Sequence, residues 1–142
     1  MARRDFLRDD NLSLKAAGLV AATAAGSLVL DLGAGLVEGN ALIDVTALEI
    51  ASNDEKYDIV IQLSPDAAFG TAGNIQDTSS LSLSAKEVKV TDSDKDDTTG
   101  RYILPVSNEV AGTVYRYMRI YTVVAGAIAT GINYSATLCP LK

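Results

Sequence analysis

The stretch Gly100–Val124, GRYILPVSNEVAGTVYRYMRIYTVV, says more about the fold than any other part of the sequence. It predicts two β-strands joined by a polar turn. Successive side chains of a strand point to opposite sides of the sheet. The second strand is therefore expected to carry two sets of side chains, Tyr115, Tyr117, Arg119 and Tyr121 on one face and Val114, Arg116, Met118 and Ile120 on the other. Such faces suit a sheet that contacts other protein on either side, and they hold no group of catalytic character.

Strand-like alternation recurs along the rest of the chain. It is clearest where Tyr57, Ile59, Ile61 and Leu63 share one side, before Ser64-Pro65-Asp66 ends the strand. Further strands are expected at Ser27–Leu32, Ala41–Ile50, Thr78–Val90 (with a break near Ala85–Glu87), Arg101–Val106, Thr113–Val124 and Ala127–Leu138. Seven to eight antiparallel strands without intervening helices favour an all-β, single-domain β-sandwich or jelly roll. The polar start of the chain predicts an extended N-terminal arm at residues 1–20, followed by the sandwich domain at residues 21–142.

Charge is unevenly distributed along the chain. The 142 residues carry a net charge of −6, but the first eight hold Arg3, Arg4 and Arg8 against Asp5, so this basic segment carries +2 and the remainder −8. An acidic body argues against non-specific binding of nucleic acid, which needs clustered lysine and arginine. A basic segment at the start of such an acidic protein predicts a tail that docks on another surface. The sequence has no run of about 20 strongly apolar residues, so no membrane span is predicted.

Missing residue types exclude several kinds of active site. The chain has no histidine, which removes Ser-His-Asp and Cys-His catalytic systems and zinc held by histidine. Its single cysteine, Cys139, excludes an internal disulfide and is expected to be a small apolar residue near the end of the last strand. We therefore expect a protein that is not an enzyme and that uses no cofactor and no metal.

One local pattern leaves an alternative function open. The run Arg3-Arg4-Asp5-Phe6-Leu7-Arg8 resembles a twin-arginine export signal, with Ala16–Ala25 as its apolar segment. Asp9, Asp10 and Lys15 interrupt the region where that segment should build up. The alternative is an exported surface or adhesion-type β-sandwich, for which a mature N-terminus near Ala25 is expected.

Two other segments resemble known functional motifs only in part. Leu28–Gly35, LVLDLGAG, resembles the first motif of S-adenosylmethionine-dependent methyltransferases, with Glu49 near the place of a ribose-binding acid. The next strand follows too soon for the crossover of a parallel sheet, so a turn between antiparallel strands is expected. Asp92–Asp97 begins like a calcium loop, but Asp97 stands where glycine is needed and Ile103 where glutamate is needed. A solvated acidic loop is expected there.

Several segments in order resemble the small capsid cement (decoration) proteins of tailed bacteriophages, in the family with a jelly-roll fold. The segments are LVLDLGAG (28–35) with its Ala/Thr-rich lead, YDIVIQLSPDAAFG (57–70), GRYILPVSNEV (100–110), YRYMRIYTVV (115–124) and INYSATL (132–138). Each segment consists of residue types that are common in strands and turns. The resemblance therefore depends on the order and spacing of the segments over Ala21–Leu138. The basic segment Arg3–Arg8 does not match the family pattern, and the acidic tract Thr91–Gly100 is interpreted as an insertion.

The resemblance implies a structural virion protein. It would be made in the host bacterial cytoplasm, assemble as a homotrimer, and cement adjacent subunits of the major capsid protein on the outer surface of an icosahedral capsid. Neither nucleic acid nor a membrane is expected as a partner. Contact with the capsid or with a neighbouring subunit is predicted for residue types that are enriched in interfaces. These residues are Arg3, Arg4, Phe6, Leu7, Arg8, Tyr115, Arg116, Tyr117, Arg119 and Tyr121.

Overall fold

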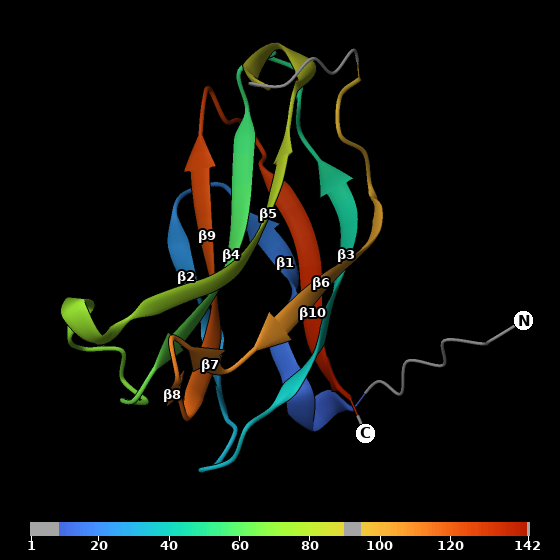
Figure 1. The fold of residues 1–142 in the computed structure, drawn as a ribbon. Coiled ribbons are helices and arrows are strands. Elements are labelled where there is room, and N and C mark those ends of the chain that lie inside the picture. Colours follow the sequence, from blue (N-terminus) through green and yellow to red (C-terminus); the bar gives the residue numbers. More distant parts are fainter. Residues whose placement is uncertain (1–8, 90–94, 142) are drawn as a thin grey trace, which may run out of the picture.

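Two four-stranded antiparallel sheets pack against each other in a sandwich-like arrangement (Figure 1). The computed structural model describes residues 9–89 and 95–141. The first sheet has the order β1 (Ser13–Val20), β10 (Ile132–Pro140), β3 (Glu38–Leu48), β6 (Gly100–Ser107). The second has the order β2 (Ala24–Asp31), β9 (Tyr117–Ala125), β4 (Lys56–Ser64), β5 (Gln76–Ser84). The prediction of an all-β fold of antiparallel strands is confirmed.

Short elements join the long strands. The two-residue strands β7 (Glu109–Val110) and β8 (Thr113–Val114) form a hairpin. Three 3-10 turns are η1 (Asp10–Leu12), η2 (Ala72–Asn74) and η3 (Lys86–Val88). The break predicted near Ala85–Glu87 is confirmed, because β5 ends at Ser84 and η3 follows.

The core lies between the sheets and follows the alternation of the sequence. On β4, the side chains of Tyr57, Ile59, Ile61 and Leu63 are all buried, as their shared parity predicts. Strand β10 contributes a second buried row, Ile132, Tyr134, Ala136 and Leu138. The Tyr134 hydroxyl is hydrogen-bonded to the Thr122 hydroxyl inside this core, so burial leaves no lone polar group there. Burial of each large apolar side chain stabilises the fold by about 1.5–3 kcal/mol.

The two strands predicted within Gly100–Val124 lie in different sheets. β6 pairs with β3 in the first sheet, whereas β9 pairs with β2 and β4 in the second. The β7–β8 hairpin lies between them, and its turn residues Ala111 and Gly112 have φ of 50° and 81°. Positive φ at both turn residues is typical of the two-residue turn that matches the twist of a hairpin.

The predicted faces of the second strand are right for part of its length. From Tyr117 onward the alternation holds, with Met118 and Ile120 buried. Before Tyr117 it fails, because the chain leaves extended pairing between β8 and β9. Val114 and Arg116 are exposed, so the prediction that they share the face of Met118 and Ile120 was wrong.

The end of the predicted N-terminal arm belongs to a sheet. Ser13–Val20 forms β1, which pairs with β10, and Leu14 is 0 % exposed. The prediction of an arm up to residue 20 was wrong for this strand, since an edge strand needs few apolar residues to join a core. A bulge interrupts β1, and the Lys15 ammonium lies there with hydrogen bonds to the carbonyls of Ala16, Gly18 and Tyr134. Lysines and bulges are common devices for protecting a sheet edge.

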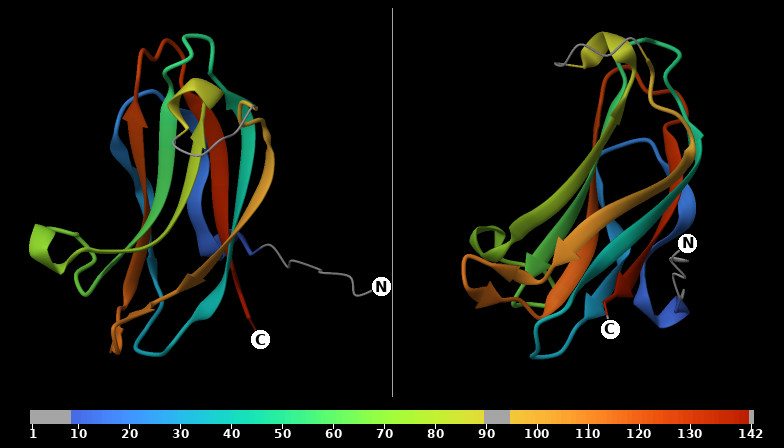
Figure 2. Two further views of the ribbon diagram at one scale, coloured as in Figure 1. Left: turned by 45° about the horizontal axis from the view of Figure 1, so that its top comes forward. Right: turned by 45° about the vertical axis from the view of Figure 1, so that its right-hand side comes forward.

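Connections gather at two ends of the sandwich (Figure 2). Pairing places Ser13 opposite Thr137, Glu38 opposite Ser107 and Ser64 opposite Tyr117. The end where these pairs lie is called the tip end. It holds 9–12, 32–37, 65–75, 108–116 and residue 141. The opposite end, the far end, holds 21–23, 49–55, 126–131 and the described parts of the β5–β6 connection, 85–89 and 95–99.

Candidate interaction surface

Three of the predicted contact residues form a cluster on the outside of the second sheet. Tyr117, Arg119 and Tyr121 alternate along β9 with buried residues and are themselves half-buried. The Arg119 guanidinium lies 5.7 Å from the centre of the Tyr121 ring. The prediction that these three side chains share a face is confirmed, and their surroundings are called the β9 face.

Arg119 is held in place by neighbours on two other strands. Its Nε donates to the side-chain oxygen of Gln62 at 3.0 Å, and the Gln62 amide donates to Asp77 at 3.0 Å. These residues stand opposite one another in the pairing of β9, β4 and β5. On its other side the guanidinium lies 4.1 Å from the ring centre of Phe69, a cation–π contact. Arg119 is therefore ordered before any partner arrives.

Arg116 lies beside this face and is already paired. Its guanidinium makes two hydrogen bonds to the Asp31 carboxylate, at 2.7 and 2.8 Å. This contact, with a hydrogen bond from the Gly33 N–H, lowers the pKa of Asp31 to about 2. The Asp31 carboxylate in turn raises the pKa of Arg116. The pair is charge-compensated, so Arg116 does not present a free positive charge to a partner.

Tyr115 lies apart from the β9 face. Its backbone N–H donates to the Asn108 carbonyl at 2.8 Å, and its side chain packs against the edge of the core. The prediction that it shares a face with Tyr117 was wrong, for the same reason as for Val114 and Arg116. The remaining predicted contacts, Arg3, Arg4, Phe6, Leu7 and Arg8, lie outside the described residues.

The β9 face combines aromatic, aliphatic and compensated polar groups. Val29 stands opposite Arg119 and is exposed, as is Val123 farther along β9. Aromatic residues and arginine are enriched in protein interfaces, whereas unpaired charges are depleted at interface centres. This face has the composition of a surface that contacts protein.

Asn108 joins two loops at the tip end, a feature that the sequence analysis missed. Its side-chain oxygen accepts from the Val37 N–H at 2.8 Å, and its amide nitrogen donates to the carbonyls of Gly35 and Tyr115, each at 2.9 Å. Its own N–H donates to the Val37 carbonyl at 3.1 Å. The residue is 0 % exposed. These bonds fix 33–37 and 108–115 to each other, and the joined loops are called the Asn108 tip.

Apolar side chains project from the Asn108 tip. Leu36 is 53 % exposed, and Val114 is 40 % exposed. Each lies next to a residue whose backbone is bonded to Asn108. Exposed acids, Glu38 and Glu109, flank them, and Glu109 stands opposite Val114 in the hairpin. The Leu-Gly-Ala-Gly-Leu sequence of this loop predicts a turn. It does not predict that the turn contacts Asn108.

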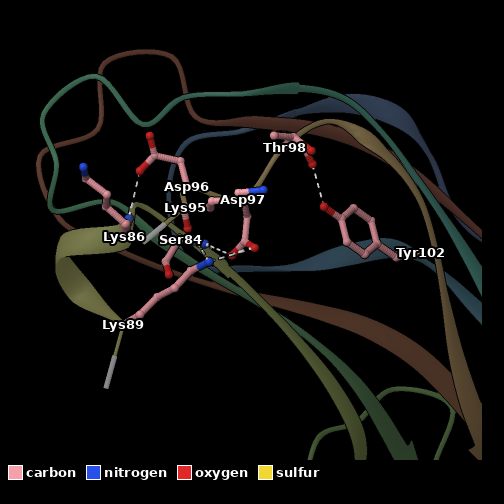
Figure 3. Close-up of polar contacts among 8 residues, drawn as sticks. All are labelled: Ser84, Lys86, Lys89, Lys95, Asp96, Asp97, Thr98 and Tyr102. Atoms are coloured by element: carbon pink, nitrogen blue, oxygen red, sulfur yellow. Dashed lines mark hydrogen bonds and ion pairs between the residues drawn. The ribbon is translucent and has the colours of Figure 1, made fainter. Parts of the chain in front are cut away.

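The acidic tract at the far end binds its own chain where it is described (Figure 3). Asp97 accepts from the Ser84 N–H at 2.8 Å and pairs with the Lys89 ammonium at 3.0 Å, while Asp96 accepts from the Lys86 N–H at 2.9 Å. Asp92 and Asp94, the first carboxylates of the calcium-like pattern, lie outside the described residues. Within residues 9–89 and 95–141 there is no group of three or more side chains arranged to hold a metal ion.

The segment that resembles a methyltransferase motif connects the two sheets. β2 ends at Asp31 in the second sheet, and β3 begins at Glu38 in the first, so the predicted turn is present at residues 33–34 but connects strands of different sheets. In the part of the chain that is described, no helix is long and apolar enough to cross a membrane. No protein-family model matches the chain, and no curated protein matches it in sequence.

Proposed function

We propose that this chain is a structural protein of a tailed-phage virion that binds the outer surface of an icosahedral shell and cements adjacent major capsid subunits. The observation that supports this best is the asymmetry between the two ends. The described chain begins at Asp9 at the tip end, where the basic residues Arg3–Arg8 join it and where Leu36 and Val114 are exposed. Asp96 and Asp97 of the acidic tract lie at the far end. The tip end then faces the shell.

We further propose that the sandwich is a jelly roll. The pairing β1–β10, β2–β9, β3–β6 and β4–β5 joins the first long strand with the last and works inward to one central hairpin. A long hairpin rolled up in this way gives two four-stranded sheets, as in a jelly roll of eight strands. This order supports the fold implied by the resemblance.

The stoichiometry of three comes from the resemblance and remains a prediction. The β9 face is the surface that we assign to contact between copies, because Arg116 is paired with Asp31, Arg119 is hydrogen-bonded to Gln62, and Tyr117 and Tyr121 are half-buried there. An oligomer presents several copies of each capsid contact, so modest individual affinities combine. Free energy gained only in the assembled shell then raises the temperature at which the shell breaks.

The position of β1 weighs against the export alternative. Cleavage near Ala25 would remove all of β1 and the start of β2, together with the buried side chain of Leu14. It would also leave β10 without its outer neighbour in the first sheet. A leader that is discarded after export is not expected to complete the sheet of the mature domain.

Binding to shells tests the proposal. The purified chain is mixed with empty shells assembled from the major capsid protein encoded with it, and binding is measured by co-sedimentation. Native mass spectrometry gives chain length and stoichiometry. We expect saturable binding, a higher shell melting temperature and a full-length trimer. Absence of binding would refute the function, a mass starting near Ala25 would favour export, and another stoichiometry would correct the trimer alone.

A further inference from the structure

We propose that Leu36 and Val114 are the anchor of this protein on the shell, and that they enter an apolar socket of the major capsid protein rimmed by basic side chains. This inference rests on the proposed function and names the contact that would carry it. Both residues belong to the Asn108 tip and lie at the end from which the basic segment departs.

Hydrogen bonds hold the Asn108 tip rigid. Asn108 uses its amide oxygen and nitrogen to bind three backbone groups, and its own N–H and carbonyl are bonded as well. The Gly33 N–H also donates to Asp31 at 2.9 Å, and the Leu32 N–H to the Arg116 carbonyl at 2.8 Å. Connecting loops usually vary and move. A loop pair fixed in this way loses little conformational entropy when it binds, which favours affinity.

The rigid Asn108 tip exposes apolar side chains to solvent. A turn that only connects strands is well served by polar side chains, yet Leu36 is 53 % exposed and Val114 is 40 % exposed. Each of the two lies next in sequence to a residue whose backbone is bonded to Asn108, and exposed apolar groups on a fixed backbone suit an interaction site. Small neighbours, Gly35 and Gly112, leave the approach open, since a Cβ added at either position would meet nothing within 4 Å.

The charges beside Leu36 and Val114 indicate the chemistry of the partner. Glu38 and Glu109 are exposed beside the two apolar residues. Complementary charge on the partner therefore means lysine or arginine around the socket. The same acids disfavour insertion of the tip into a bacterial membrane, because the surface of anionic lipid repels carboxylates. A protein socket fits both the apolar and the charged groups.

The test compares two double variants with matched exposure. Leu36→Ser with Val114→Ser removes the anchor. Leu19→Ser with Ile103→Ser removes a leucine (62 % exposed, against 53 % for Leu36) and an aliphatic residue (42 %, against 40 % for Val114) from the first sheet, away from the tip. Both pairs are on the surface, so unfolding midpoints close to that of the parent protein are expected and are checked first. Affinity for empty shells is then measured for each.

We expect the tip variant to bind shells about 30-fold more weakly or worse, as for loss of an interface hot spot, and the control variant to bind like the parent. Equal binding by the tip variant and the parent would overturn the anchor while leaving the proposed function intact. Equal loss in both variants would overturn it too. If the parent itself does not bind shells, the proposed function fails and the anchor with it.

Two further measurements exclude other occupants of the tip. Native mass spectrometry of the tip variant is expected to give the stoichiometry of the parent, and a change to monomer would instead assign the tip to contact between copies. Vesicles of phosphatidylglycerol and phosphatidylethanolamine are expected not to sediment with the parent. Binding to vesicles that the tip variant loses would assign the tip to lipid and overturn the proposal.

Discussion

The carboxylate of Glu49 binds the loop 126–131 at the far end of the sandwich. It accepts hydrogen bonds from the N–H groups of Ala129, Thr130 and Gly131, at 3.0, 2.6 and 2.6 Å. The hydroxyl of Thr130 adds a fourth, at 3.2 Å. These bonds, that from Gly131 foremost, lower the pKa of Glu49 below its ordinary value of 4.5. A single carboxylate thus orders the connection between β9 and β10.

Glu49→Gln is expected to lower the melting temperature at pH 7, because the amide offers one neutral acceptor oxygen in place of two charged ones. A carboxylate with a lowered folded-state pKa stabilises the protein above its ordinary pKa, and this stabilisation is lost as pH falls through the folded-state value. The difference between parent and variant should therefore shrink below about pH 4.5. Thermal unfolding followed by circular dichroism from pH 7 to 3 measures it.

The matched control for this residue is Glu87→Gln, since Glu87 is an exposed acid in η3 at the same end. Little change in melting temperature is expected for it. A gap between parent and Glu49→Gln that stays constant across the pH range would show that the charge of Glu49 does not act as described.

Single residues also show where sequence-based prediction reaches its limit. The burial of Tyr57 and Ile59 was predictable, because alternation within one strand is a local property. The role of Asn108 was not, since its partners Gly35 and Val37 are 73 and 71 positions away in the chain. Phe69 was missed as well: it has a positive φ of 50° in a loop, and its ring contact with Arg119 requires two segments to meet.

Among the strands, β1 is the one that could not be recognised from the sequence. Its inward side chain is Leu14, whereas Ala16, Ala17 and Leu19 are exposed, so the segment lacks a clear apolar alternation. Backbone pairing with β10 holds it in the sheet. Polar composition predicted an arm because composition reports the average of a segment, while one buried leucine is enough to attach an edge strand.

Leu14→Ala is therefore expected to destabilise the fold by about 2–5 kcal/mol, the usual cost of emptying a buried leucine site. Leu19→Ala, on the same strand but 62 % exposed, is expected to change stability by less than about 0.5 kcal/mol. Urea unfolding of both variants measures the difference. Similar small effects for the two leucines would mean that β1 is not part of the cooperative fold.

The pairing of the strands was also not predictable from the sequence. The strands within Gly100–Val124 were predictable one by one, yet their assignment to two sheets was not. A turn between consecutive strands predicts a hairpin by default, since sequential strands are usually neighbours. Here only the short β7–β8 segment forms that hairpin, and the long strands pair with partners far away in sequence. Loops that cross between sheets have no local signature that distinguishes them from hairpin turns.

For the molecule as a whole, charged segments are attached at opposite ends of the sandwich. The sequence Arg3–Arg8 precedes Asp9 at the tip end, Asp96 and Asp97 of the acidic tract lie at the far end, and the tip end also carries the exposed acids Glu38 and Glu109. A basic segment raises the rate of productive encounters with a surface of opposite charge. The charge pattern was predictable from the sequence. That the described chain begins at the tip end, and that Asp96 and Asp97 lie at the far end, required the fold.

Deletion of Met1–Arg8 is expected to leave the fold intact and to weaken binding to shells. The cut retains Asp9, whose carboxylate accepts from the Asn11 N–H at 2.9 Å and caps η1, so the urea midpoint should match that of the full chain. Loss of three arginine contacts at a surface predicts a roughly 3- to 100-fold lower affinity. Salt screens such contacts, so the affinity of the full chain should fall with ionic strength more steeply than that of the truncated one.

A triple variant, Arg3→Ser with Arg4→Ser and Arg8→Ser, separates charge from length in this segment. If the arginines carry the contact, the triple variant binds shells as weakly as the deletion and shows the same shallow dependence on salt. Weak binding by the deletion with normal binding by the triple variant would assign the contact to Phe6 and Leu7 instead. Unchanged binding by both would mean that the basic segment does not reach the shell, and that docking depends on the folded tip end alone.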